Sequence, residues 1–198
     1  MRAMIPPSSD RAGAAAAAAR FAATAVPDVS YAVIDLPVGR VVAARTARGL
    51  VRIAYDDLNG GIDQILQRLA DRLSPRILEA PGRLEDVQRE LERYFAGDLR
   101  RFTVPLDWAL VGGFATSVLR ATAAIPYGEV STYGAISTAV GRPGASRAAG
   151  NALGSNPIPI VIPCHRVLRS GGGLGGYTGG LHRKQALLAV EAAGRGSP

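Results

Sequence analysis

The chain has 198 residues, of which 47% are hydrophobic, and a formal net charge of +7. This length suits one large domain or two small ones, and no run of residues approaches the ~20 consecutive apolar residues of a membrane span. The single cysteine excludes an intramolecular disulfide and indicates a reducing compartment, so we expect a cytoplasmic protein. With only two histidines, the sequence holds no cluster of ligands for a structural metal ion.

The positive charge is concentrated in the second half of the chain. Residues 1–110 hold 15 arginines and 14 acidic residues, whereas residues 111–198 hold eight arginines and lysines and only two acidic residues, Glu129 and Glu191. A basic domain is the footprint of a polyanionic partner such as nucleic acid, although a basic surface that only aids solubility gives the same count. Charge by itself is therefore weak support for nucleic acid binding.

Residues 1–28 are rich in alanine and of low sequence complexity. A signal peptide would need a leucine-rich hydrophobic centre, and Arg20 interrupts the alanine run. We expect a disordered or partly helical tail here.

Residues 29–110 alternate between strand and helix signals and predict a small mixed α/β domain. Extended, apolar stretches separated by glycine-containing turns indicate an antiparallel sheet, and two stretches with apolar residues at helical spacing indicate amphipathic helices. Their acidic residues are expected on solvated helix faces and form no catalytic cluster. The expected strands lie at 31–34, 41–42, 50–53 and 102–104, and the expected helices at 62–73 and 84–95.

Residues 111–155 contain three expected helices, of which the last two form a helix-turn-helix pattern. Pro126 ends the first helix, Ser131 is the expected N-cap of the second, and a short Gly-Arg-Pro-Gly link separates the second from the third. The three helices are expected at 114–125, 131–140 and 145–153.

The third of these helices is rich in alanine and glycine and carries one charge, Arg147. A recognition helix in the major groove normally offers several long polar side chains to base edges. A slim helix with one long cation better suits the minor groove, entered without sequence readout. The alternative is an ordinary buried, alanine-rich helix.

The segment from Asn156 to Val167 holds the only cysteine, Cys164, next to His165. Its prolines fix the backbone, and its apolar run of strand-like residues indicates a buried segment. A buried free cysteine is often only a small hydrophobic residue. Neighbouring His and Arg side chains can also lower the pKa of a thiol and make it a nucleophile, and the residues of this segment leave both interpretations open.

A glycine-rich stretch at 170–180 follows, with Tyr177 and Thr178 inside it. Such stretches are usually flexible linkers, but bare backbone also lets a loop approach a ligand closely, and an aromatic ring in it can stack on a base. It lacks the Lys-Ser/Thr of a phosphate-binding P-loop. A helix at 181–193 closes the chain, and its Glu191 is by default a surface residue.

Three motifs in this order, N-P-I-P, P-C-H-R-V and G-G-Y-T-G-G, resemble the active-site region of the O6-alkylguanine-DNA alkyltransferases. The resemblance runs from about Phe114 to Glu191, and a looser one includes L-E-R-Y-F-A-G-D-L in the first half. It implies an α/β (α+β) fold, with an RNase H-like domain at 29–110 and a mainly helical DNA-binding domain at 111–198 that carries the helix-turn-helix.

The resemblance also implies roles for individual residues. Cys164 corresponds to the catalytic nucleophile, which His165 activates through a water molecule, Glu191 orients His165, and Asn156 braces the turn. Arg147 corresponds to the residue that fills the place of the displaced base, and a phosphate-contacting Arg can occur where this chain has Gly154. The remaining implied residues are Tyr133, Leu153, Val167, Tyr177 and Thr178 for the substrate, and Thr132, Ala148, Asn151 and Ser155 for DNA.

The implied function is repair of double-stranded DNA that carries O6-alkylguanine. The base would be flipped out of the duplex, and its alkyl group transferred irreversibly to Cys164, without a cofactor or metal, by a monomer that associates with the nucleoid. O4-alkylthymine as a substrate and cooperative binding are left open. Two rivals are a lesion-binding protein without transfer and a cysteine hydrolase, although an adjacent Cys-His pair rarely faces one substrate.

Overall fold

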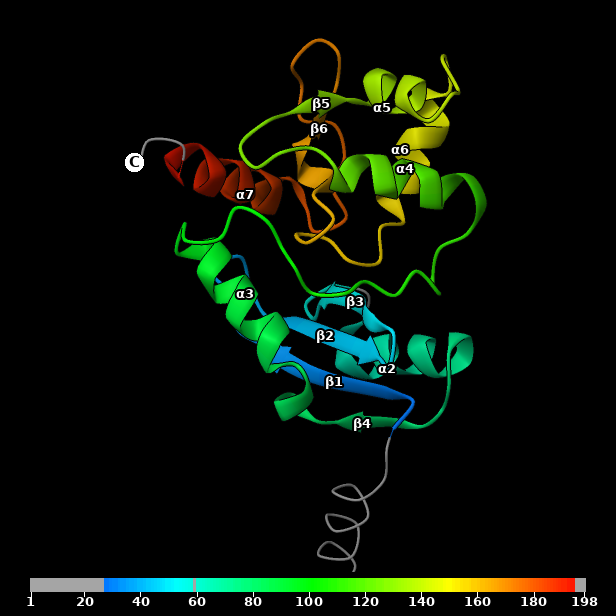
Figure 1. Ribbon diagram of the computed structural model, residues 1–198, viewed down its shortest axis with the longest axis vertical. Coiled ribbons are helices and arrows are strands. Elements are labelled where there is room, and N and C mark those ends of the chain that lie inside the picture. Colours follow the sequence, from blue (N-terminus) through cyan, green and yellow to red (C-terminus); the bar gives the residue numbers. More distant parts are fainter. Residues whose placement is uncertain (1–26, 59, 195–198) are drawn as a thin grey trace, which may run out of the picture.

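The computed structural model describes residues 27–58 and 60–194. The expected tail at 1–28 lies outside the described residues except for its last two. A sheet domain and a helical domain lie one above the other, and the carboxyl end of the helix α3 approaches α7 (Figure 1). None of the described helices has the length and apolar character needed to cross a membrane.

The first domain is built on a four-stranded sheet with the order β3-β2-β1-β4, in which β1, β2 and β3 are antiparallel and β4 is parallel to β1. Side chains alternate between the two faces of β2. Val42 and Ala44 pack against the helix at 61–72, whereas Val41 and Ala43 face the core that is shared with the second domain. Both faces are buried. The elements are β1 Val29–Ile34, β2 Val41–Thr46, β3 Gly49–Tyr55, α2 Gly61–Arg72, β4 Ile77–Glu79, the 3₁₀ turn η1 Pro81–Arg83 and α3 Glu85–Phe95.

The strand expected at 102–104 is wrong, and β4 was not expected. The backbone N–H of Thr103 donates to the Glu90 carboxylate at 2.8 Å, so it is not available to a sheet. The following Pro105 has no N–H, and only an isolated bridge joins Leu106 to Leu50. The other expected elements of this domain are confirmed to within a few residues.

Within residues 113–194, the second domain has four α-helices and a two-stranded parallel sheet of β5 and β6. Helix α5 begins one residue later than expected, because the hydroxyl of Thr132, rather than Ser131, accepts the N–H of Ala135 at 3.1 Å. The helix-turn-helix prediction is confirmed as a pair of packed helices, α5 and α6. The elements are α4 Gly113–Ala123, β5 Ser131–Thr132, α5 Tyr133–Ala139, α6 Ser146–Gly154, η2 Cys164–Arg166, β6 Val167–Leu168 and α7 Leu181–Gly194.

Residues 157–163 are buried as expected, but they form tight turns between the two domains. The N–H of Ile162 donates to the carbonyl of Ile158 at 2.9 Å, and Ile160 has a positive φ of 75°. Such a φ is strained for a β-branched residue. The N–H of Ile53 on β3 donates to the Pro157 carbonyl at 2.8 Å, which ties these turns to the sheet.

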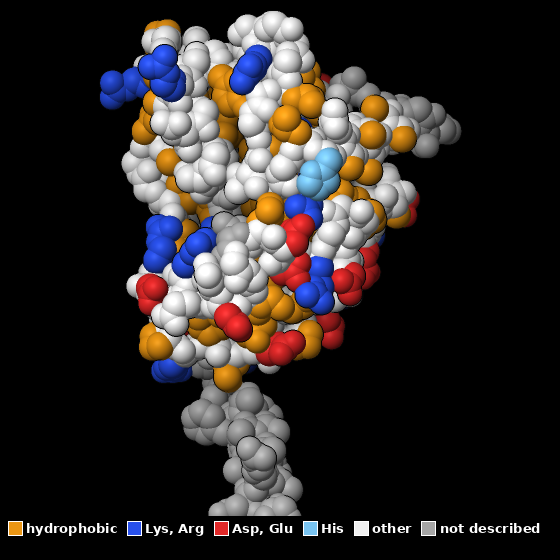
Figure 2. Space-filling view, turned by 180° about the vertical axis from the view of Figure 1, so that it is seen from behind, with side chains coloured by type: hydrophobic (Ala, Val, Ile, Leu, Met, Phe, Trp, Pro, Cys, Tyr) orange, Lys and Arg blue, Asp and Glu red, His pale blue; other side chains and the backbone are white. Residues whose placement is uncertain are grey.

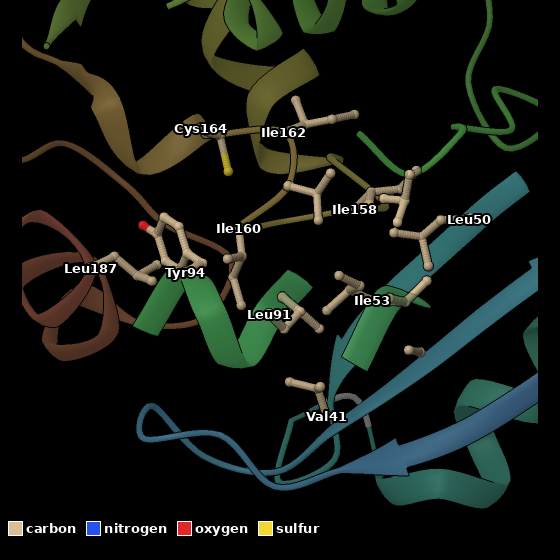
Figure 3. Packing of buried hydrophobic residues seen from close by; sticks show 14 of the residues in the cluster. Val41, Leu50, Ile53, Leu91, Tyr94, Ile158, Ile160, Ile162, Cys164 and Leu187 are labelled. Carbon is tan, nitrogen blue, oxygen red and sulfur yellow. The ribbon is translucent and has the colours of Figure 1, made fainter. Parts of the chain in front are cut away.

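One hydrophobic core runs through both domains. Side chains of α3 and the sheet pack against the turns before Cys164 and against α7 (Figure 3). Tyr94 of α3 lies beside Ile160 and Leu91 of the same helix lies below it, while Leu187 of α7 closes the side (Figure 3). The sheet domain is therefore the floor on which the cysteine-bearing turn rests.

Candidate active site

Cys164 begins the short 3₁₀ turn η2 and is buried, with 5% of its surface exposed. The amide of Asn156 holds its position: Nδ2 donates to the Cys164 sulfur at 3.2 Å and to the Ile162 carbonyl at 2.9 Å, while Oδ1 accepts the N–H of Ile158 at 3.0 Å. One buried amide thus fixes both the turn and the sulfur. A donor to sulfur stabilises the thiolate more than the thiol.

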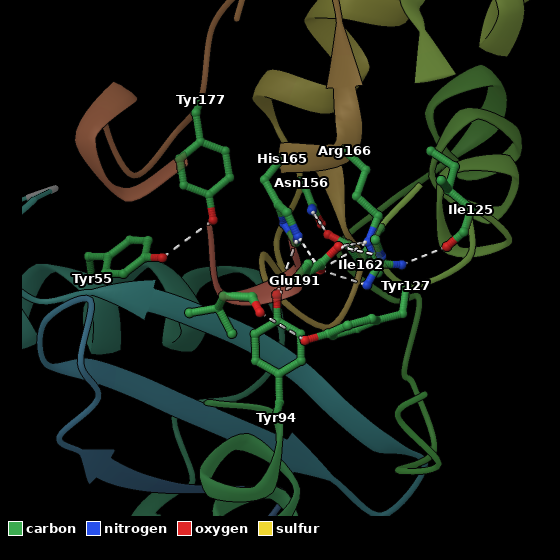
Figure 4. A network of polar contacts seen from close by, with 12 residues as sticks. Tyr55, Tyr94, Ile125, Tyr127, Asn156, Ile162, His165, Arg166, Tyr177 and Glu191 are labelled. Carbon is green, nitrogen blue, oxygen red and sulfur yellow. Dashed lines mark hydrogen bonds and ion pairs between the residues drawn. The ribbon is translucent and has the colours of Figure 1, made fainter. Parts of the chain in front are cut away.

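The two residues that follow Cys164 belong to a buried network centred on the Glu191 carboxylate (Figure 4). His165 Nε2 lies 2.9 Å from Glu191 Oε1, and the Arg166 guanidinium donates to both carboxylate oxygens at 2.8–3.1 Å. The hydroxyl of Tyr94, from α3 of the first domain, donates to the same Oε1 at 2.7 Å. Glu191 is therefore an interior residue that joins both domains.

This network determines which nitrogen of His165 carries the proton. Arg166 keeps Glu191 ionised, and a carboxylate only accepts hydrogen bonds, so Nε2 of His165 carries the hydrogen. Nδ1 then has a free lone pair, and it has no hydrogen-bond partner within the described part of the chain. A neutral imidazole with an available Nδ1 can act as a general base.

The pKa shifts agree with this assignment. Burial lowers the pKa of His165 and outweighs the opposing effect of Glu191, so the imidazole is neutral. Burial would raise the pKa of Glu191, but hydrogen bonds from His165 and Arg166 outweigh it and lower that pKa to about 2. The ion pair at the centre is therefore Glu191 with Arg166.

Burial raises the pKa of Cys164 to about 11, against the smaller lowering effects of the Asn156 hydrogen bond and the Lys184 charge. The resting sulfur is a thiol, so a nucleophilic role requires a base that takes its proton as it reacts. The Lys184 ammonium is fully buried and donates to the Val167 carbonyl at 2.7 Å and to the Leu174 carbonyl. It therefore places positive charge near the sulfur and anchors the loop that follows.

Cys164 lies on the wall of a cavity of about 690 Å³ between α5, α6 and the glycine-rich loop. This volume is within the usual range for small-molecule sites, about 300–1,000 Å³. Although the sulfur is mostly buried, it is not sealed from the surface. The cavity is lined by Tyr133, Ser146, Arg147, Gly150, Asn151, Leu153, Gly154, Cys164, Arg169, Gly175, Gly176, Tyr177 and Thr178.

The glycine-rich loop follows the cavity wall closely. A Cβ at Gly175, where φ is +70°, would lie 2.5 Å from the Tyr133 hydroxyl, and one at Gly179 would lie 2.4 Å from the Tyr55 ring. The hydroxyls of Tyr177 and Tyr55 are 3.3 Å apart, so the sheet domain also supports this loop. These contacts favour the ligand-approaching interpretation of the loop over a free linker.

The structure brings together most of the residues named from the sequence. Arg147 and Asn151 project from α6 and Tyr133 from α5, on the cavity wall that also holds Leu153, Tyr177 and Thr178. Val167 does not line this cavity, and its carbonyl accepts Lys184. The other three expected DNA contacts, Thr132, Ala148 and Ser155, lie beside the cavity rather than on its wall.

Three site residues were not expected from the sequence: Tyr94, Lys184 and Arg169. The sequence indicates Arg166 only as a cation that can lower the pKa of the thiol, whereas in the structure its guanidinium binds Glu191. Nothing local signals Tyr94, which lies 97 residues from its partner Glu191. Lys184 stands on α7 among residues of mixed polarity, so its burial gives no pattern in the sequence.

Comparison with known proteins places the whole described chain in one family. Residues 29–108 match the ribonuclease-like domain of 6-O-methylguanine DNA methyltransferase, and residues 113–193 match its DNA binding domain. The methylated-DNA–protein-cysteine methyltransferase of Mycobacterium bovis is 39% identical over 164 residues, which are 82% of this chain and 92% of that protein. The inducible enzyme of that name from Bacillus subtilis is 36% identical over 149 residues, 75% of this chain and 82% of that protein.

A solved structure shows the same fold in the presence of DNA. It is the crystal structure of Mycobacterium tuberculosis OGT in complex with DNA, with a TM-score of 0.72 and 37% identity, which covers 83% of this chain and 94% of that one. The mixed α/β fold with a helical second domain is therefore shared with that structure.

Proposed function

The chain belongs to the O6-methylguanine DNA methyltransferase family, and on this premise we propose that it repairs DNA by moving the alkyl group of O6-alkylguanine onto its own Cys164. The observation that carries the proposal is the position of that sulfur. It lies on the wall of a cavity large enough for a purine and beside a neutral histidine whose Nδ1 is unpartnered within the described residues.

The reaction is a direct displacement at the alkyl carbon. The Cys164 thiol gives up its proton through a water molecule to Nδ1 of His165, and the Glu191 carboxylate stabilises the imidazolium that forms, while Arg166 holds that carboxylate in place. The sulfur forms a bond to the alkyl carbon as the bond from that carbon to O6 breaks. The purine oxygen leaves with the electron pair, and a donor at the base, such as the Tyr133 hydroxyl, balances its charge.

The target base lies inside a duplex, so it must first be turned out into the cavity. Arg147 on the slim helix α6 is exposed and lines the cavity mouth, where its side chain can occupy the vacated place in the stack. Tyr177 and Thr178 from the loop line the base. The DNA backbone at the minor groove is contacted by four other residues: Thr132, Ala148, Asn151 and Ser155. The Thr178 hydroxyl already donates to the Gly154 carbonyl at 2.9 Å in the free protein. The Val167 carbonyl, another of the expected substrate contacts, accepts a hydrogen bond from Lys184.

The product is a thioether, for which the site offers no route back to the thiol. Each molecule therefore reacts once. We propose that it does so as a monomer on double-stranded DNA in the cytoplasm, and that the chemistry uses only the side chains named above.

Mass spectrometry after incubation with a duplex that carries one O6-methylguanine tests the proposal. We expect one added methyl group on the peptide that contains Cys164, a yield of repaired DNA that stops at one per protein, and no transfer by Cys164→Ala. His165→Ala should transfer more slowly, whereas His182→Ala, which changes an exposed histidine, should react normally. DNA binding without a mass change would select the lesion-binding rival, and more than one turnover would select the hydrolase.

A further inference from the structure

A second cavity of about 290 Å³ lies between the two domains, next to the one that holds Cys164. The sheet domain contributes three arginines, Arg52 from β3 and Arg68 and Arg72 from α2. Figure 2 shows Lys and Arg side chains grouped at the waist of the molecule. None of the described residues that line this cavity is acidic. The other lining residues are Ile65, Leu69, Leu110, Gly154, Ser155, Asn156 and Thr178.

A further cavity of the sheet domain also has three arginines on its wall, but there Glu85 and Asp86 stand among them, whereas the described lining of this cavity has no acidic residue. Residues 1–110 are almost neutral overall, yet three cations converge on one cavity wall. Arg68 and Arg72 are four residues apart on α2, so they share one face of the helix. A hydrogen bond from Arg72 to the Leu110 carbonyl at 3.0 Å holds that side chain at the cavity, while the nearby Asp71 is bound by Gln67 at 2.8 Å.

The charges repel one another within the free protein. Arg52 is only partly exposed, and burial first, then the charges of Arg68 and Arg72, lower its pKa. Like charges held together around a cavity are unfavourable unless an anion lies between them. A phosphate group has the negative charge and the pairs of acceptor oxygens that match the planar fork of donors on an arginine guanidinium.

The second cavity adjoins the cavity at Cys164. Gly154 and Thr178 line both, and the Thr178 hydroxyl donates to the Gly154 carbonyl at 2.9 Å. Gly154 has no side chain, and open space lies where a Cβ would project. A nucleic acid strand whose base enters the first cavity can therefore place a backbone phosphate near the arginines.

We propose that Arg52, Arg68 and Arg72 form a phosphate site of the sheet domain, which binds the backbone of the same DNA whose base enters the cavity at Cys164. The proposal rests on the proposed function, because it uses the DNA of that reaction as its ligand. It gives the sheet domain a direct contact with the substrate in addition to its role as the floor of the active site.

The test measures DNA affinity as a function of salt. Binding of a fluorescent duplex with one O6-methylguanine is followed from about 50 to 200 mM salt for the wild type, Arg52→Gln, Arg68→Gln and the double variant. Arg89→Gln, on the exposed surface of α3 away from this cavity, is the matched control. Each lost phosphate contact should reduce the slope of log affinity against log salt by about 0.9. The Arg68 side chain is exposed, so the Arg68→Gln variant should fold and can be measured even if the Arg52→Gln variant unfolds.

We expect a smaller slope for both cavity variants and the wild-type slope for Arg89→Gln. Their reaction with free O6-benzylguanine should be unchanged, because that substrate has no phosphate. Unchanged slopes in both cavity variants, or an equal decrease in the control, would overturn the phosphate site. Failure of the wild type to methylate Cys164 is a separate result that would overturn the proposed function alone, since the salt slope reports binding.

Discussion

Tyr94 lies in the sheet domain, yet its hydroxyl reaches the Glu191 carboxylate at the centre of the buried polar network. Replacing it with phenylalanine removes one hydrogen bond of 2.7 Å to the Glu191 carboxylate and leaves the ring in the core. A hydrogen bond to a charged group contributes about 1.5–3 kcal/mol. Glu191 retains its donors from His165 and Arg166, so we expect the lower half of that range, about 1.5–2 kcal/mol.

For a protein of this size, 1 kcal/mol corresponds to about 2–4 °C in the melting temperature. The Tyr94→Phe variant should therefore melt about 3–8 °C lower than the wild type, as measured by circular dichroism at pH 7. Its rate of alkyl transfer should also decrease, because Glu191 is held less firmly against His165. The rate is measured with free O6-benzylguanine, so that DNA binding does not contribute.

Tyr127→Phe is the matched control for this prediction. The Tyr127 hydroxyl donates to the neutral Val190 carbonyl at 3.2 Å and lies in a partly exposed position. Removing it should cost only about 0.5–1 kcal/mol and leave the transfer rate unchanged. If the two variants melt within about 1 °C of each other and react equally fast, the idea that Tyr94 positions Glu191 is refuted.

Two further predictions concern the flipping residue and the acid limit of stability. Arg147→Ala should slow repair of duplex DNA at least tenfold (about 1.4 kcal/mol or more) but leave reaction with free O6-benzylguanine nearly unchanged; equal losses would contradict a flipping role. The pKa of Glu191 is about 2 in the folded protein and about 4.3 when unfolded, so its stabilising contribution is complete above the unfolded value and is lost as the pH falls through the folded one. Urea unfolding between about pH 5 and 2 should show a loss about 2–3 kcal/mol larger for the wild type than for Glu191→Gln, because at pH 2 the folded carboxyl is only half protonated; parallel curves would show that Glu191 is not the responsible carboxyl.

Local patterns predicted the helices and the strands β1, β2 and β3, because each has an apolar face with a regular period, but not the short strands β4, β5 and β6. The failures occur where tertiary contacts decide. The stretch 102–104 has strand-like residues, but the Glu90 carboxylate takes the N–H groups of Thr103 and Val104. Ser131 and Thr132 are equally good caps by type, and only the backbone geometry selects Thr132.

The candidate site was only partly accessible from the sequence. Cys164, His165 and Asn156 lie in one short segment, so a family resemblance could name them together. Tyr94 and the three arginines of the second cavity come from the other domain, and their meeting with the C-terminal residues depends on how the domains pack. Neither periodicity nor spacing carries that information.

The core described above belongs to neither domain separately. Ile160 and Leu187 complete the interior beneath the sheet, and Leu91 and Tyr94 complete the interior beneath the cysteine. A fragment holding only the second half of the chain would expose this apolar seam to water and lose the phenol that steadies its carboxylate. The sheet half offers no reacting atom, but it covers this apolar surface and supplies that phenol permanently, because it is part of the same chain.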